Sequence, residues 1–144
     1  MALTALALPA TLDTSTHNLI ADFFIPALAN ATQYDRGVGY FSSGWLQITA
    51  KGMVDFAEHG GRARWVTSPI LSEADWEALQ LGDQARTDPI LHGVMARNIK
   101  DLAQALQANT LSAMAWMVAD GILDFKLALP TNKLTGGDFH GQIG

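Results

Sequence analysis

The chain has 144 residues, a length that suits one domain with a hydrophobic core of its own. Hydrophobic residues make up 49% of the chain, charged residues make up 16%, and cysteine is absent. This composition is typical of a globular protein and excludes a disulfide scaffold, a cysteine nucleophile and a cysteine zinc site. The net charge of −5 excludes a broad basic surface for nucleic acid or for an anionic membrane.

The sequence gives no sign of a membrane segment. No apolar run reaches the roughly 18 residues that a bilayer span needs. The first residues, MALTALALPATLD, lack a basic start and are interrupted by Thr4 and Pro9, which is unlike a signal peptide. We therefore expect a cytoplasmic protein without a membrane partner.

The first half of the chain predicts a strand–helix–strand unit. A helix is expected over residues 14–31, with a kink or a split at Pro26. A strand over 36–42, a helix over 44–58 and a second strand over 62–69 follow. Such a unit is right-handed and places its two strands in parallel.

The second half predicts more helices and a third strand. A capping box predicts a helix that covers about 72–81 and stops at a glycine. Helices over 89–108 and 111–120, a strand over 123–129 and the start of another strand over 139–143 follow. We therefore expect one α/β domain, residues 1–144, with a mostly parallel, partly mixed sheet covered by helices.

Polar segments lie at the ends of the first two predicted strands, at residues 40–44 and 67–69. Parallel strands end at the same edge of a sheet, so we expect the two segments to lie close together. Backbone N–H groups at a helix start can bind phosphate, although simple capping by serine is the more common explanation of such a segment. The candidate phosphate ligands are Ser42, Ser43, Thr67 and Ser68.

His140 is the candidate catalytic residue, because it follows a Gly-Gly loop and histidine acts as a nucleophile or a general acid near neutral pH. The alternative is a solvated histidine near a chain end. The other histidines have no metal-like spacing, so we expect no metal site and no cofactor. Arg36, Arg62 and Arg64 are interpreted as solvated charges and not as a basic patch.

The order of segments resembles a phospholipase D-like domain, in the version found ahead of DEAD/DEAH-type helicases. The resemblance rests on YDRGVGYFSSGWL, HGGRARWVTSP, LSAMAWMVADGILDFKLALP and GGDFH, and it runs from about residue 14 to residue 140. The catalytic signature of that superfamily is His-x-Lys with an Asp four residues later. His140 stands at the position of the motif histidine, Gln142 replaces the lysine, and the Asp would lie beyond residue 144.

The resemblance implies a metal-independent phosphodiesterase mechanism. A histidine attacks phosphorus, a second histidine from another half-domain protonates the leaving oxygen, and lysines hold the phosphate oxygens. It implies that this chain is the N-terminal half-domain, truncated before the motif ends, in a DNA-processing or phage-defence helicase. Such a chain is catalytically incomplete and pairs with a second copy or with a missing C-terminal half.

Two other functions stay open at this stage. One is a non-catalytic module that binds nucleic acid or another protein. The other is a lipid-directed phospholipase, which the acidic charge and the lack of an amphipathic membrane helix disfavour.

Overall fold

The structure is a computed structural model that describes residues 3–95, 101–129 and 142–143. Its centre is a sheet with the strand order β3-β2-β1-β4. Strands β1 (Gln33–Val38), β2 (Arg62–Thr67) and β3 (Leu123–Leu127) are parallel, and the short β4 (Gln142–Ile143) pairs antiparallel with β1. The predicted α/β class and the mostly parallel, partly mixed sheet are therefore confirmed.

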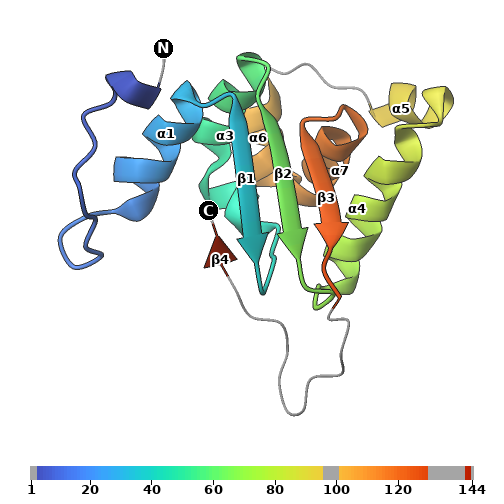
Figure 1. Cartoon of the computed structure of the whole chain (residues 1–144). Helices are drawn as coiled ribbons and strands as arrows, with labels where there is room; N and C mark the ends of the chain where they lie inside the picture. Colours follow the sequence, from blue (N-terminus) through green and yellow to red (C-terminus); the bar gives the residue numbers. More distant parts are fainter. Residues whose placement is uncertain (1–2, 96–100, 130–141, 144) are drawn as a thin grey trace, which may run out of the picture.

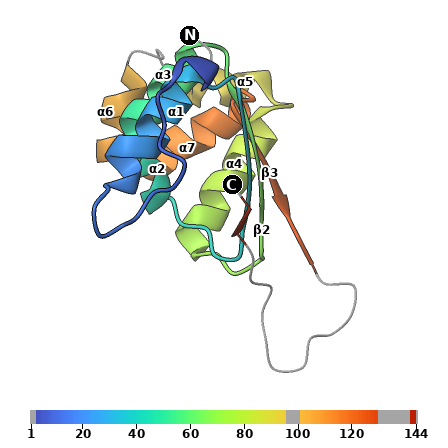
Figure 2. The same ribbon diagram turned by 60° about the vertical axis from the view of Figure 1, so that its left-hand side comes forward.

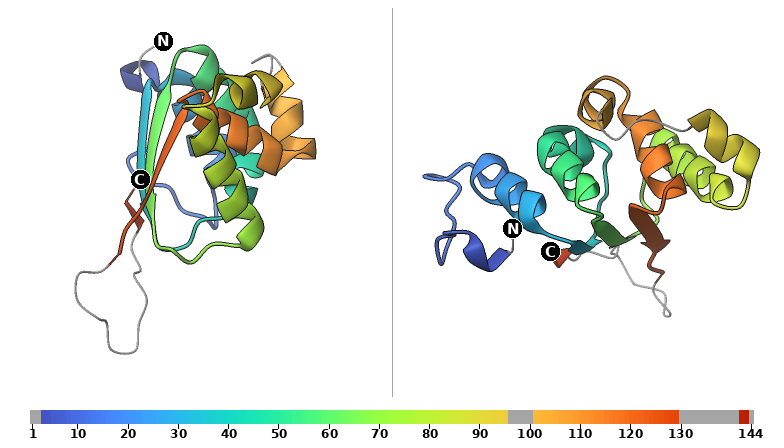
Figure 3. Two further views of the ribbon diagram at one scale, coloured as in Figure 1. Left: turned by 90° about the vertical axis from the view of Figure 1, so that its right-hand side faces the viewer. Right: turned by 90° about the horizontal axis from the view of Figure 1, so that it is seen from above.

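The helices cover one face of the sheet. The helices and helical turns of the described residues are η1 (Leu3–Ala5), η2 (Ile20–Phe24), α1 (Ile25–Asn30), α2 (Gly44–Ile48), α3 (Ala50–Glu58), α4 (Glu73–Ala85), α5 (Pro89–Met95), α6 (Leu102–Ala108) and α7 (Thr110–Ala119). Figure 1 shows α3, α6 and α7 behind the three parallel strands. Seen from the side and from above, the opposite face of the strands carries no helix in the described part of the chain (Figure 3).

Side chains of β2 alternate between the two faces, as a sheet covered on one side requires. Trp65 and Thr67 are buried beneath the helices. The exposed residues on the other face are Arg62, Arg64 and Val66. The uncovered face is therefore mainly polar, which is the pattern expected of a face in contact with water.

The core lies between the sheet and the helices. Helix α7 is apolar on all sides, and every residue from Ala113 to Ala119 is buried. It packs between α6 and α4, while α1 packs against α3 at the β1 end of the sheet (Figure 2). The Met and Trp residues of α7, interpreted from the sequence as core, are buried there. None of the helices in the described ranges is long and apolar enough to cross a membrane.

Several element boundaries differ from the predictions for physical reasons. The first helix begins at Ile20 as a π-helix and becomes α-helical at Ile25, so Pro26 lies in a first turn that tolerates its missing N–H. The first strand begins three residues early, at Gln33, and ends at Val38. The predicted helix over 89–108 appears as α5 and α6, and residues 96–100 between them lie outside the described ranges.

The predicted helix over 44–58 is divided at Thr49. The Thr49 hydroxyl donates a hydrogen bond to the Trp45 carbonyl (2.7 Å), a local contact that bends helices. Helix α3 starts directly after this residue, at Ala50. Ile48, just before the break, is 55% exposed, whereas Leu46 and Met53 are fully buried.

Candidate functional site

Two polar segments meet at the edge of the sheet where β1 and β2 end. Val38 and Thr67 are neighbours in the parallel register, so residues 39–44 and 67–69 leave the sheet side by side. The Ser68 hydroxyl donates a hydrogen bond to the Gly39 carbonyl and joins the two segments directly. We call residues 39–44 and 67–69 the sheet rim. The predicted meeting of the two segments is confirmed.

The four candidate phosphate ligands have different surroundings at the sheet rim. Ser42 is exposed, and its hydroxyl accepts a hydrogen bond from the Gly44 N–H (3.2 Å). Ser43 is half-buried just ahead of α2. Thr67 and Ser68 are each only 1% exposed, so their hydroxyls face the protein interior. The accessible hydroxyls of the rim therefore come from the first segment.

An acidic residue already occupies the start of α2. The Asp75 carboxylate, 5% exposed, accepts a hydrogen bond from the Ser43 N–H (3.2 Å). A helix N-terminus favours a negative charge, and here the protein supplies that charge itself. A phosphate bound at this N–H would therefore have to displace Asp75.

The capping box predicted at the start of α4 is formed by Ser72 and Asp75: the Ser72 hydroxyl accepts a hydrogen bond from the Asp75 N–H (3.1 Å). The Asp75 side chain, by contrast, accepts a hydrogen bond from the Ser43 N–H at the start of α2, 32 residues away in the chain. No local pattern could have shown this second role, because the contact depends on the relative placement of α2 and α4.

His140 lies outside the described residues, so its predicted catalytic position stays a prediction. Described residues closest to it in the chain are Gln142 and Ile143, which form β4 beside Val38 and Gly37. The C-terminal end of β1, where the sheet rim begins, is therefore next to β4.

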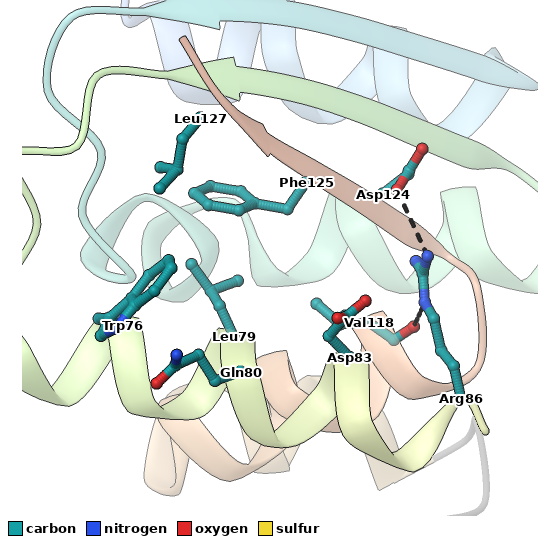
Figure 4. A pocket seen from close by; sticks show the side chains of 9 residues that line it. All are labelled: Trp76, Leu79, Gln80, Asp83, Arg86, Val118, Asp124, Phe125 and Leu127. Atoms are coloured by element: carbon teal, nitrogen blue, oxygen red, sulfur yellow. Dashed lines mark hydrogen bonds and ion pairs between the residues drawn. The ribbon is translucent and has the colours of Figure 1, made fainter. Parts of the chain in front are cut away.

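The outer edge of β3 borders a small pocket of about 250 Å³ between β3, α4 and α7. Figure 4 shows its lining residues: Trp76, Leu79, Gln80, Asp83, Arg86, Val118, Asp124, Phe125 and Leu127. Arg86 donates to the carbonyls of Val118 (2.7 Å) and Leu123 (2.8 Å) and pairs with Asp124. Since these contacts use the Arg86 donors to join α4, α7 and β3, we assign this pocket a structural role.

Charges on the uncovered face of the sheet are mixed. Arg64 pairs with Asp35 on the neighbouring strand, with a distance of 2.8 Å from Nε to Oδ1. Arg62 and Lys126 are exposed on the same face. Arg36 points to the opposite face, beneath the helices, so the three arginines do not share a surface.

Nothing in the described ranges gathers three His, Asp or Glu side chains into a group that could hold a metal ion. No family model, curated protein or solved structure matches this chain.

Proposed function

We propose that the chain is a phosphodiester-directed, nuclease-like half-module of the phospholipase D-like kind, catalytically incomplete by itself. In this proposal it belongs to a DNA-processing or phage-defence helicase. The observation that supports it best is the sheet rim. Two polar segments meet where parallel strands end, which is the edge at which open α/β sheets bind ligands.

The proposal assigns the attack on phosphorus to His140 and the protonation of the leaving oxygen to a histidine of a second half-module. Gln142, which replaces the lysine of the resembling motif, offers an uncharged amide to the phosphate. Because a lost charged donor weakens transition-state stabilisation, this chain alone should cleave slowly or not at all.

A second candidate is a non-catalytic module that binds nucleic acid or a protein partner. Asp75 favours it, because a buried carboxylate at the start of α2 repels the phosphate that a cleavage site must hold. The two candidates differ in the effect they predict for His140→Ala: the first predicts that cleavage is lost, and the second predicts that binding is unchanged.

The test is cleavage of single-stranded DNA in EDTA by a natural protein that contains this chain and continues past residue 144. We expect cleavage to persist in EDTA and to be lost in the His140→Ala variant, because histidine is the proposed nucleophile. The matched control is His59→Ala, which removes an exposed histidine after α3 and should leave cleavage unchanged.

Cleavage that survives His140→Ala would remove His140 from the mechanism. The non-catalytic candidate instead predicts salt-sensitive DNA binding by the 144-residue chain, unchanged in His140→Ala, as measured by fluorescence anisotropy. A flat anisotropy signal at low salt would exclude nucleic-acid binding by this chain.

A further inference from the structure

Arg36 is a half-buried cation on the helix-covered side of β1. Its guanidinium carbon lies 4.3 Å from the centre of the Trp45 ring and 5.9 Å from the centre of the Trp65 ring. Trp65 is also its neighbour across the parallel pair β1–β2. Arg36 therefore lies beside two indole rings, one from the sheet and one from α2.

Hydrogen-bond donors without acceptors surround this cation. The Tyr34 hydroxyl, the Trp45 Nε1–H and the Trp65 Nε1–H are buried and have no hydrogen-bond partner among the described residues. Each buried polar group left in this state lowers stability, because the hydrogen bonds that it made to water are not replaced. Native proteins contain few such groups, so several in one place indicate a missing acceptor.

The Tyr34 hydroxyl links this donor cluster to the cation. Burial raises the pKa of Tyr34, while the charge of Arg36 and the nearby Trp45 N–H act in the opposite direction. Tyr34 and Arg36 lie two residues apart on the same face of β1, and the Tyr34 hydroxyl has no hydrogen-bond partner among the described residues. Tyr34 packs edge-to-face on Trp65, with ring centres 5.7 Å apart.

No described carboxylate forms an ion pair with Arg36. Arg64 and Arg86 differ, because each pairs with an aspartate. The walls around Arg36 are aromatic instead: Phe24 packs on Trp45 (4.7 Å between ring centres) and Phe41 packs on Trp65 (5.5 Å). Such walls lower the local dielectric and strengthen the attraction of an anion to the cation.

We propose that Arg36, Tyr34 and Trp45 form an anion site that binds a phosphate group. The guanidinium offers a planar fork of N–H donors, and the hydroxyl and the indole add donors from other elements. A phosphate group presents more acceptor oxygens than a carboxylate and matches this surplus of donors better. The site does not depend on the function proposed above, because none of these residues belongs to the sheet rim.

The test is titration of the 144-residue chain with inorganic phosphate, followed by tryptophan fluorescence. Trp45 and Trp65, two of the four tryptophans, lie beside Arg36, so binding should change the emission. We expect a saturable change that Arg36→Gln weakens by at least about tenfold, since a charged hydrogen-bond donor is lost. Tyr34→Phe keeps the ring and should weaken binding several-fold.

The matched control is Arg62→Gln, which removes an exposed arginine of the adjacent strand and should leave binding unchanged. Circular dichroism checks that each variant folds. If Arg36→Gln does not fold, the Tyr34→Phe variant tests the site instead. Acetate at equal ionic strength should compete poorly. The same titration with a short single-stranded oligonucleotide tests whether the site binds a phosphate group within nucleic acid or only a free phosphate group.

No saturable change with phosphate or oligonucleotide would overturn the proposal. The proposal would also be overturned if the wild-type chain and the Arg36 and Tyr34 variants bound phosphate equally well. Acetate that binds as tightly as phosphate would overturn the assignment to phosphate.

Discussion

The Asp35 carboxyl shows how hydrogen bonds from neighbouring side chains set the ionisation of an exposed residue. The hydrogen bonds from Arg64, followed by one from Gln33, lower the pKa of the Asp35 carboxyl from 3.8 to about 2. Both side chains are exposed, so the pair contributes little to stability. Its clearest signature is therefore the titration of Asp35 and not the melting temperature.

Arg64→Gln should raise the pKa of Asp35 from about 2 towards 3.8, because the largest cause of the lowering is removed. A lowered pKa in the folded state stabilises the fold above the unfolded value of 3.8. That small contribution is lost as the pH falls towards about 2. The measurement is the pH titration of the Asp35 carboxyl carbon by NMR.

The control for this titration is Arg62→Gln, because Arg62 lies on the same strand and face and donates to the Gly61 carbonyl instead. It should leave the Asp35 titration unchanged. A pKa of Asp35 that stays near 2 in Arg64→Gln would mean that the pair does not form in solution.

The contact between helices α4 and α7 depends on one glycine. Gly82 was predicted to end its helix, but α4 continues to Ala85. A Cβ atom at position 82 would clash with the Ala115 carbonyl oxygen and would lie 2.7 Å from the Val118 Cβ. The glycine is required by close packing of two helices and not by a turn.

Gly82→Ala should lower the free energy of unfolding by about 1–3 kcal/mol, since the added methyl group must push α4 and α7 apart. The gain in helix propensity, about 1 kcal/mol, offsets only part of this cost. Urea denaturation followed by circular dichroism measures the change.

Gly93→Ala is the matched control, because position 93 lies within α5 and a Cβ atom there meets nothing within 4 Å. It should raise the free energy of unfolding by up to about 1 kcal/mol. If both variants stabilise the protein equally, the close contact between α4 and α7 does not exist in solution.

At the scale of the whole molecule, a few contacts between distant segments fix the sheet rim. The Ser68 hydroxyl reaches the Gly39 carbonyl across 29 residues, and the Asp75 carboxylate reaches the Ser43 N–H across 32. These contacts join the end of β1, the end of β2 and the start of α4. They hold the rim segments in one arrangement.

Asp75→Ala should lower the free energy of unfolding by about 1–3 kcal/mol, because the Ser43 N–H loses its acceptor in a mostly buried position. Asp75→Asn should recover part of this loss, since an amide oxygen can still accept the bond. Thermal and urea unfolding of the three proteins provide the measurement.

Glu73→Ala is the control for Asp75, because Glu73 is an exposed acid in the same first turn of α4. Glu73→Ala should lower the free energy of unfolding by about 0.3–1 kcal/mol, because only the interaction with the helix dipole is lost. Equal losses in Asp75→Ala and Glu73→Ala would show that the long-range contact with Ser43 contributes nothing.

Much of the fold could be predicted from local patterns. Gly60 and Gly121, with φ of 74° and 75°, end helices where the sequence predicted. The second and third strands appear within the predicted ranges, because apolar and polar residues alternate there. The error at Gly82 arose where one helix touches another, which no local pattern encodes.

The sequence by itself determined the α/β class, the parallel strands and the meeting of the two polar segments at one sheet edge. These features follow from periodicity and chain direction, which are local properties of the chain. Only the tertiary structure placed the Asp75 carboxylate at the start of α2, buried Thr67 and Ser68, and placed Arg36 beside two tryptophans. Those outcomes depend on how separate elements pack, because burial and side-chain contact arise between segments distant in the chain.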